Sequence, residues 1–186
     1  ILDLKNFINL NDTKSLKELF TRIFPEFDNL ERLDRLKKIC NHSQITRDIL
    51  LAVLLIDEKN NYEYFAHKYS ISNEIKEKLN LFARDLRLLA EDENFFYKDL
   101  EKNIYLKNKN YLINLNIVNF VNNFKFKLND FSKIFKMILK SKVHLFPIDG
   151  KYLMNNGMKE GSTLGRVLKI IEKEWIANGF KISKDR

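Results

Sequence analysis

The sequence predicts an all-α protein, a bundle-like arrangement of about ten helices. Three observations predict it. Apolar residues recur at helical spacing along almost the whole chain. Apolar residues make up 45% of the sequence, which is enough to fill a core. All five glycines lie between Gly150 and Gly179, and this argues against a β-sandwich, a Rossmann fold and a P-loop enzyme, which need glycine in tight turns and phosphate loops.

Five helices are predicted before a polar break at residues 91–94. Their apolar stripes cover residues 16–23, 30–40, 49–56, 62–69 and 75–89. Ser72 stands where an N-cap of the fifth helix is expected. The longest unbroken apolar run, residues 49–56, is far shorter than the ~20 residues that a membrane-spanning helix needs. We therefore expect this run to be the buried centre of a helix, and no membrane as a partner.

Three more helices are predicted after the break, over about 95–106, 110–124 and 129–142. The break divides the chain into a helical body region, residues 1–93, and a basic body and tail region, residues 94–186. The helix at 129–142 has two contrasting faces. Its apolar face carries Phe131, Ile134, Phe135 and Ile138, and its basic face carries Lys133, Lys136 and Lys140.

Positive charge is concentrated in the second half of the chain. Residues 95–145 contain ten lysines and three acidic residues, whereas residues 1–94 contain slightly more acidic than basic residues. A basic stretch of this kind favours a polyanionic partner such as RNA, because lysines neutralise backbone phosphates. The phosphate contacts predicted here are Lys133, Lys136, Lys140 and Lys142. A merely solvated lysine face is the alternative.

No complete catalytic or metal site is predicted within the chain, and no cofactor. The sequence has no Asp-x-Asp pair of the kind that holds two metal ions on a strand. His42, His67 and His144 lie far apart, and none precedes an aspartate. Cys40 is the only cysteine, so no internal disulfide can form and a reducing, cytoplasmic setting is expected.

The glycine cluster predicts a short helix, a turn and a second helix. Gly157 is placed to end the short helix, and Gly161 precedes the second, whose apolar stripe ends at Trp175. A side chain at Gly165 would obstruct the close approach of another helix or of a phosphate. The amides and side chains at the start of this helix form a candidate anion site. Its predicted members are Ser162, Thr163, Arg166 and Lys169. A purely structural corner packed through glycine is the alternative.

This segment resembles the C-terminal end of the class II tRNA nucleotidyltransferase and bacterial poly(A) polymerase family. The matching positions are Pro147, Gly150, Leu153, Gly157, Gly161, Gly165, Leu168 and Trp175. The ending Trp-Ile-Ala-Asn-Gly-Phe at 175–180 is similar to that of bacterial CCA-adding enzymes in particular. Two positions depart from the family pattern: Tyr152 stands at a usually acidic position, and Ser162 where proline is frequent.

The resemblance implies the C-terminal body and tail of a CCA-adding enzyme, which holds the acceptor arm and elbow of tRNA. Nucleotide addition from CTP and ATP with Mg²⁺ would belong to a catalytic head and neck preceding Ile1. A poly(A) polymerase acting on general RNA 3′ ends is an alternative within the family. A helical interaction module that does not act on RNA is an alternative from another class.

Overall fold

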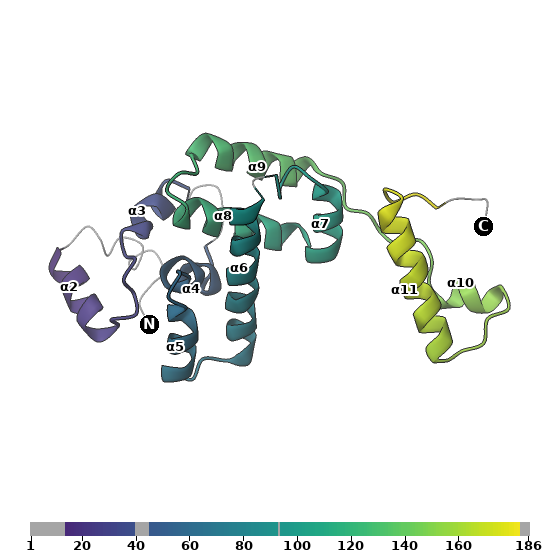
Figure 1. The fold of residues 1–186 in the computed structure, drawn as a ribbon, viewed down its shortest axis with the longest axis horizontal. Helices are drawn as coiled ribbons and strands as arrows, with labels where there is room; N and C mark the ends of the chain where they lie inside the picture. Colours follow the sequence, from purple (N-terminus) through teal and green to yellow (C-terminus); the bar gives the residue numbers. More distant parts are fainter. Residues whose placement is uncertain (1–13, 40–44, 93, 183–186) are drawn as a thin grey trace.

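The computed structural model describes residues 14–39, 45–92 and 94–182, so Cys40 and His42 lie outside the described residues. The described residues form ten α-helices and no strand, which confirms the predicted all-α class (Figure 1). Eight helices precede residue 141 and are called the body here: α2(Lys14–Ile23), α3(Arg32–Lys37), α4(Arg47–Leu55), α5(Asn61–Lys68), α6(Asn73–Glu91), α7(Leu100–Lys107), α8(Lys109–Asn122) and α9(Leu128–Lys140). Two follow residue 149 and are called the tail: α10(Gly150–Asn155) and α11(Ser162–Ala177).

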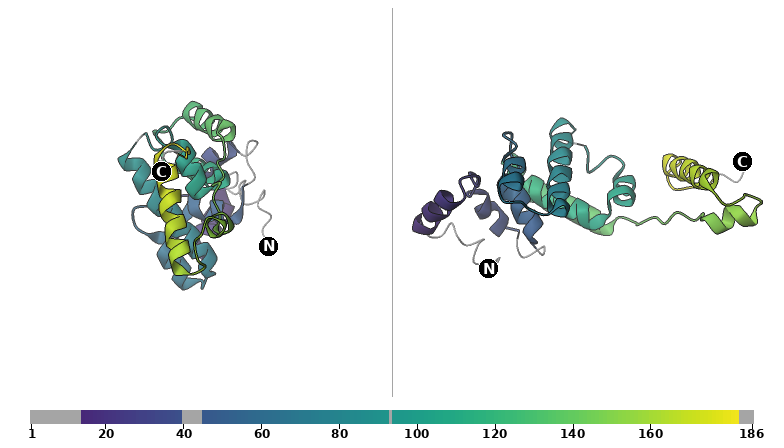
Figure 2. Two further views of the ribbon diagram at one scale, coloured as in Figure 1. Left: turned by 90° about the vertical axis from the view of Figure 1, so that its right-hand side faces the viewer. Right: turned by 90° about the horizontal axis from the view of Figure 1, so that it is seen from below.

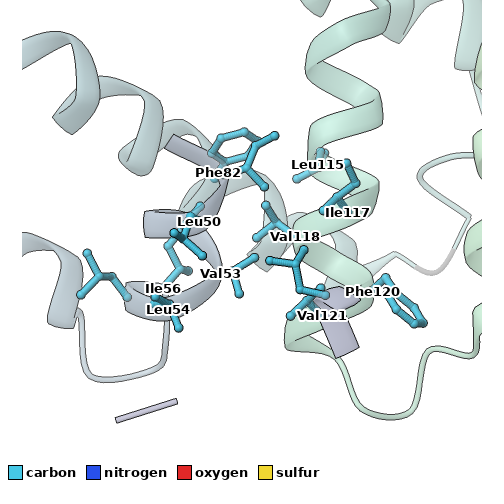
Figure 3. Close-up of a cluster of buried hydrophobic side chains, with 14 of the residues drawn as sticks. Leu50, Val53, Leu54, Ile56, Phe82, Leu115, Ile117, Val118, Phe120 and Val121 are labelled. Atoms are coloured by element: carbon cyan, nitrogen blue, oxygen red, sulfur yellow. The ribbon is translucent and has the colours of Figure 1, made fainter. Parts of the chain in front are cut away.

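Helix α8 is the centre of the body. It packs against α3, α4, α6, α7 and α9, and every residue from Leu115 to Val121 is buried. Figure 3 shows Val118 and Val121 of α8 beside Val53 of α4. Such all-round burial explains why this helix is rich in apolar residues on every face. The core extends from Phe20 to Ile138, so the helices before and after the predicted boundary at residue 93 share one core.

One predicted helix start is corrected by the structure. The helix expected over 95–106 begins at Leu100 instead, because Asp99 takes a left-handed φ of 55° and interrupts the helical path. Residues 94–98 form a turn in which the amides of Tyr97 and Lys98 donate to the carbonyl of Asn94. The ends of α8 and α9 lie within about two residues of their predicted positions, the usual margin for helix boundaries.

The glycine-free part of the chain still makes left-handed turns. Asn60, Ser70, Asp99 and Asn108 all have positive φ, between 47° and 62°. Three of them are Asn or Asp, the side chains that tolerate this region best after glycine. The turns between body helices therefore do not depend on glycine.

The tail is separated from the body by an extended segment. Residues 142–149 contain no helix, and no backbone–backbone hydrogen bond joins residues 142–148 to other described residues. Figures 1 and 2 show this segment leading away from α9 to the tail, where α10 packs on α11. None of the described helices is both long and apolar enough to cross a membrane.

Candidate nucleic-acid interface

Helix α9 has the two faces predicted from the sequence. Phe131, Ile134 and Ile138 are buried against the body, where the ring of Phe131 lies 5.2 Å from that of Phe120 on α8. The opposite side exposes three lysines to solvent, and we call them the α9 lysine face: Lys133, Lys136 and Lys140. Lys142 is also exposed, at the start of the extended segment.

These four lysines are available to a ligand. Within the described part of the chain, no carboxylate forms an ion pair with any of them. The ammonium group of Lys133 lies 5.2 Å from the ring centroid of Tyr97, a cation–π contact that leaves its charge in place. The face therefore presents uncompensated positive charge at a regular helical spacing.

The glycine corner of the tail is built by a Schellman motif. At the end of α10, the amide of Gly157 donates to the carbonyl of Met154 and the amide of Met158 to that of Leu153. Gly157 has a φ of +95°, which only glycine adopts without strain. The prediction that Gly157 ends the short helix is confirmed.

The first turn of α11 is open to solvent. Gly161 is its N-cap and supplies no side-chain cap, and Ser162, Thr163, Arg166 and Lys169 are all exposed. A methyl group at Gly165 would meet nothing within 4 Å, so this glycine does not serve packing against another described helix. Gly150 does serve packing, since a methyl group there would lie 3.3 Å from the side chain of Leu164.

The structure does not bring the two predicted clusters together. The α9 lysine face belongs to the body, whereas Ser162 and Arg166 lie beyond the extended segment (Figures 1 and 2). Within α11, the first turn is at the end opposite Trp175, and twelve residues of helix span about 18 Å. A ligand that contacts both clusters must therefore be large.

Sequence reasoning missed the contacts that attach the tail to the body. We call them the tail junction: Tyr105, His144, Phe146, Trp175 and Phe180. Tyr105 of α7 is the only member of this set that lies on a body helix. Its ring lies 5.3 Å from that of Trp175. The apolar spacing of α11 predicts that Trp175 is buried. The spacing does not indicate that Tyr105, 70 residues earlier in the chain, packs against it.

A buried carboxylate was also missed. Asp85 of α6 forms an ion pair with the neighbouring Arg84, and its side chain is fully buried. It accepts hydrogen bonds from Arg84 Nε at 3.1 Å, from the hydroxyl of Tyr111 at 2.8 Å and from the ammonium of Lys107. Burial and the bond to Asp85 raise the pKa of Tyr111 well above its ordinary value. The network joins α6, α7 and α8.

Among the described residues, no group of three or more His, Cys, Asp and Glu side chains could hold a metal ion. No protein-family model, no curated protein and no solved structure matches this chain.

Proposed function

We propose that this chain is the tRNA-binding portion of a CCA-adding tRNA nucleotidyltransferase and works in the cytoplasm. Its task would be to hold the acceptor arm and elbow of tRNA, while a head and neck preceding Ile1 add nucleotides from CTP and ATP with Mg²⁺. The α9 lysine face is the observation that carries the RNA-binding part of the proposal. Lysines in this arrangement bind phosphates without reading base sequence.

Two further features support the proposal. The first turn of α11 has no side-chain cap and carries the exposed Arg166 at the positive end of a 16-residue helix, with the exposed Lys169 one turn further on. Two of the residues that carry the family resemblance also have structural roles: Gly157 takes a positive φ and Gly150 allows contact with Leu164. The choice of tRNA over other RNAs rests on the resemblance.

The test is binding of a tRNA transcript that lacks its CCA end, measured by fluorescence anisotropy at salt concentrations from low to moderate. We expect the double variant K136E/K140E to bind at least about tenfold more weakly and to lower the slope of log K against log salt by about two. The matched control is R22E/K76E, which reverses two exposed cations outside α9. Equal binding by both variants would favour an interaction module that does not act on RNA.

A second measurement separates the two family members. A protein that carries the proposed head and neck together with this chain is given either tRNA without CCA or an unrelated RNA with the same 3′ nucleotides. A CCA-adding enzyme extends only the tRNA and stops after the missing nucleotides. Extension of both RNAs with many adenylates would instead identify a poly(A) polymerase.

A further inference from the structure

The tail junction is a small aromatic cluster centred on Trp175. Trp175 is only 5% exposed, although α11 is otherwise largely open to solvent. Four rings surround it: Tyr105 from the body at 5.3 Å, Phe146 and His144 from the extended segment at 5.3 Å and 6.3 Å, and Phe180 at 4.9 Å. Burial of Trp175 therefore depends in part on a body residue.

Phe180 reaches this cluster through a second Schellman motif. At the end of α11, the amide of Gly179 donates to the carbonyl of Ile176 and the amide of Phe180 to that of Trp175. Gly179 has a φ of +65°. The motif brings the residue after the glycine back onto the last turn of the helix, which is where Phe180 meets Trp175.

Polar contacts connect the same surfaces. The hydroxyl of Tyr105 donates to a carboxylate oxygen of Glu172, one turn before Trp175 on α11. Burial and the bond to Glu172 raise the pKa of Tyr105 to about 12. His144 makes a second connection between tail and body. Its ring stacks on that of Phe180, with the centroids 3.9 Å apart, and its Nε2 atom lies 2.5 Å from Oε2 of Glu101 on α7.

The extended segment is restrained by the side chains of His144 and Phe146, not by its backbone. It has no backbone hydrogen bond to other described residues between 142 and 148, and Leu145 is 83% exposed. The direction of the tail relative to the body is therefore determined by the tail junction. This direction decides whether the α9 lysine face and the first turn of α11 can contact one ligand at the same time, the condition for multivalent binding.

We propose that Tyr105 is a positioning residue that fixes the tail against the body, so that both cationic clusters contact separate phosphates of one RNA. This inference rests on the proposed function, and it assigns the orientation of the tail to a residue outside both cationic clusters. When the junction is broken, each cluster binds alone and the advantage of simultaneous contact is lost.

The first test uses Trp175, the only tryptophan in the chain, as a reporter of tail docking. We expect Tyr105→Ala to shift its fluorescence emission to longer wavelength and to increase quenching by acrylamide. Tyr105→Phe keeps the ring and should retain the native signal. Tyr64→Ala, which removes an exposed tyrosine of α5, is the matched control. Alanine at position 105 could disturb α7, so His144→Ala, which lies outside any helix, is measured as well. It should shift the Trp175 emission and increase its quenching in the same direction.

The second test measures RNA binding by the same variants, with far-UV circular dichroism confirming their helix content. We expect Tyr105→Ala and His144→Ala to bind about tenfold more weakly and with a salt slope lowered by about two, the number of tail cations no longer engaged. Tyr105→Phe should bind like the wild type. Recovery of the slope by phenylalanine separates positioning from a general loss of stability.

The outcomes distinguish the two proposals. If the wild type binds RNA with a steep salt dependence and both undocked variants keep its affinity and slope, the role of Tyr105 is overturned and the proposed function stands. If Trp175 emission and quenching are unchanged in Tyr105→Ala and His144→Ala, and both variants are folded, the junction does not hold the tail. The inference then also fails. If the wild type shows no salt-dependent binding of RNA, the proposed function fails and this role with it.

Discussion

Arg35 connects two helices that are far apart in the sequence. Its guanidinium donates to the carbonyl of Phe120 at the end of α8 and to those of Asn123 and Phe126 just beyond it. It also lies 4.4 Å from the centroid of the Phe120 ring. The last carbonyls of a helix have no partner within it, and a cation at this end is favoured by the helix dipole. Arg35 thus acts as a C-terminal cap supplied by another helix.

We predict that Arg35→Ala lowers the free energy of unfolding by about 2–3 kcal/mol, because several carbonyls lose a charged donor and one ring loses a cation. Arg35→Lys should recover only part of this loss, since an ammonium group cannot reproduce the planar fork of the guanidinium. Urea denaturation followed by far-UV circular dichroism measures the change. Arg22→Ala, at an exposed position of α2, is the control and should leave the midpoint nearly unchanged. Equal midpoints for the variants at 35 and 22 would contradict this role.

At the scale of the element, the two ends of α11 carry glycines with opposite requirements. Gly179 follows its last turn with a φ of +65°, whereas Gly165 lies in the helix with nothing within 4 Å of an added methyl group. Alanine strains a left-handed position but favours a helical interior. The same substitution should therefore have opposite effects at the two ends of this helix.

We predict that Gly179→Ala destabilises the tail by about 1 kcal/mol and that Gly165→Ala stabilises it by up to about 1 kcal/mol. Trp175 fluorescence during urea denaturation reports both. The second variant also tests the anion site, because an added methyl group at residue 165 should weaken RNA binding if a phosphate approaches the backbone there. If the Gly165→Ala variant is more stable and keeps full RNA affinity, no phosphate approaches the backbone at this turn.

The helices that could be predicted are those whose signals are local. Ser72 accepts a hydrogen bond from the amide of Ile75 and caps α6 as predicted, and the two faces of α9 follow from its spacing alone. The burial of Asp85 could not be predicted, because its partners Lys107 and Tyr111 lie 22 and 26 positions later. Tyr105 could not be assigned to the tail junction for the same reason. Periodicity shows which face of a helix is buried but not which helix covers it.

For the whole molecule, the body contains many more buried apolar residues than the tail. The body has one continuous core from Phe20 to Ile138. In the described tail, only Leu153 and Trp175 are buried apolar residues, and Trp175 owes part of its burial to Tyr105. Local stability follows the amount of apolar surface that a unit buries, so the tail should open at a lower free energy than the body.

We therefore predict that unfolding is not a single transition. Trp175 emission, which reports the tail, should change at a lower urea concentration than far-UV circular dichroism, which is dominated by the body helices. Tyr105→Ala should widen the separation by moving the fluorescence transition alone, because it removes the contact by which the body stabilises the tail. Arg35→Ala should narrow it by moving the circular dichroism transition, since Arg35 acts within the body. Coincident transitions in the wild type and in both variants would mean that body and tail unfold as one cooperative unit, with the small tail core as stable as the large one.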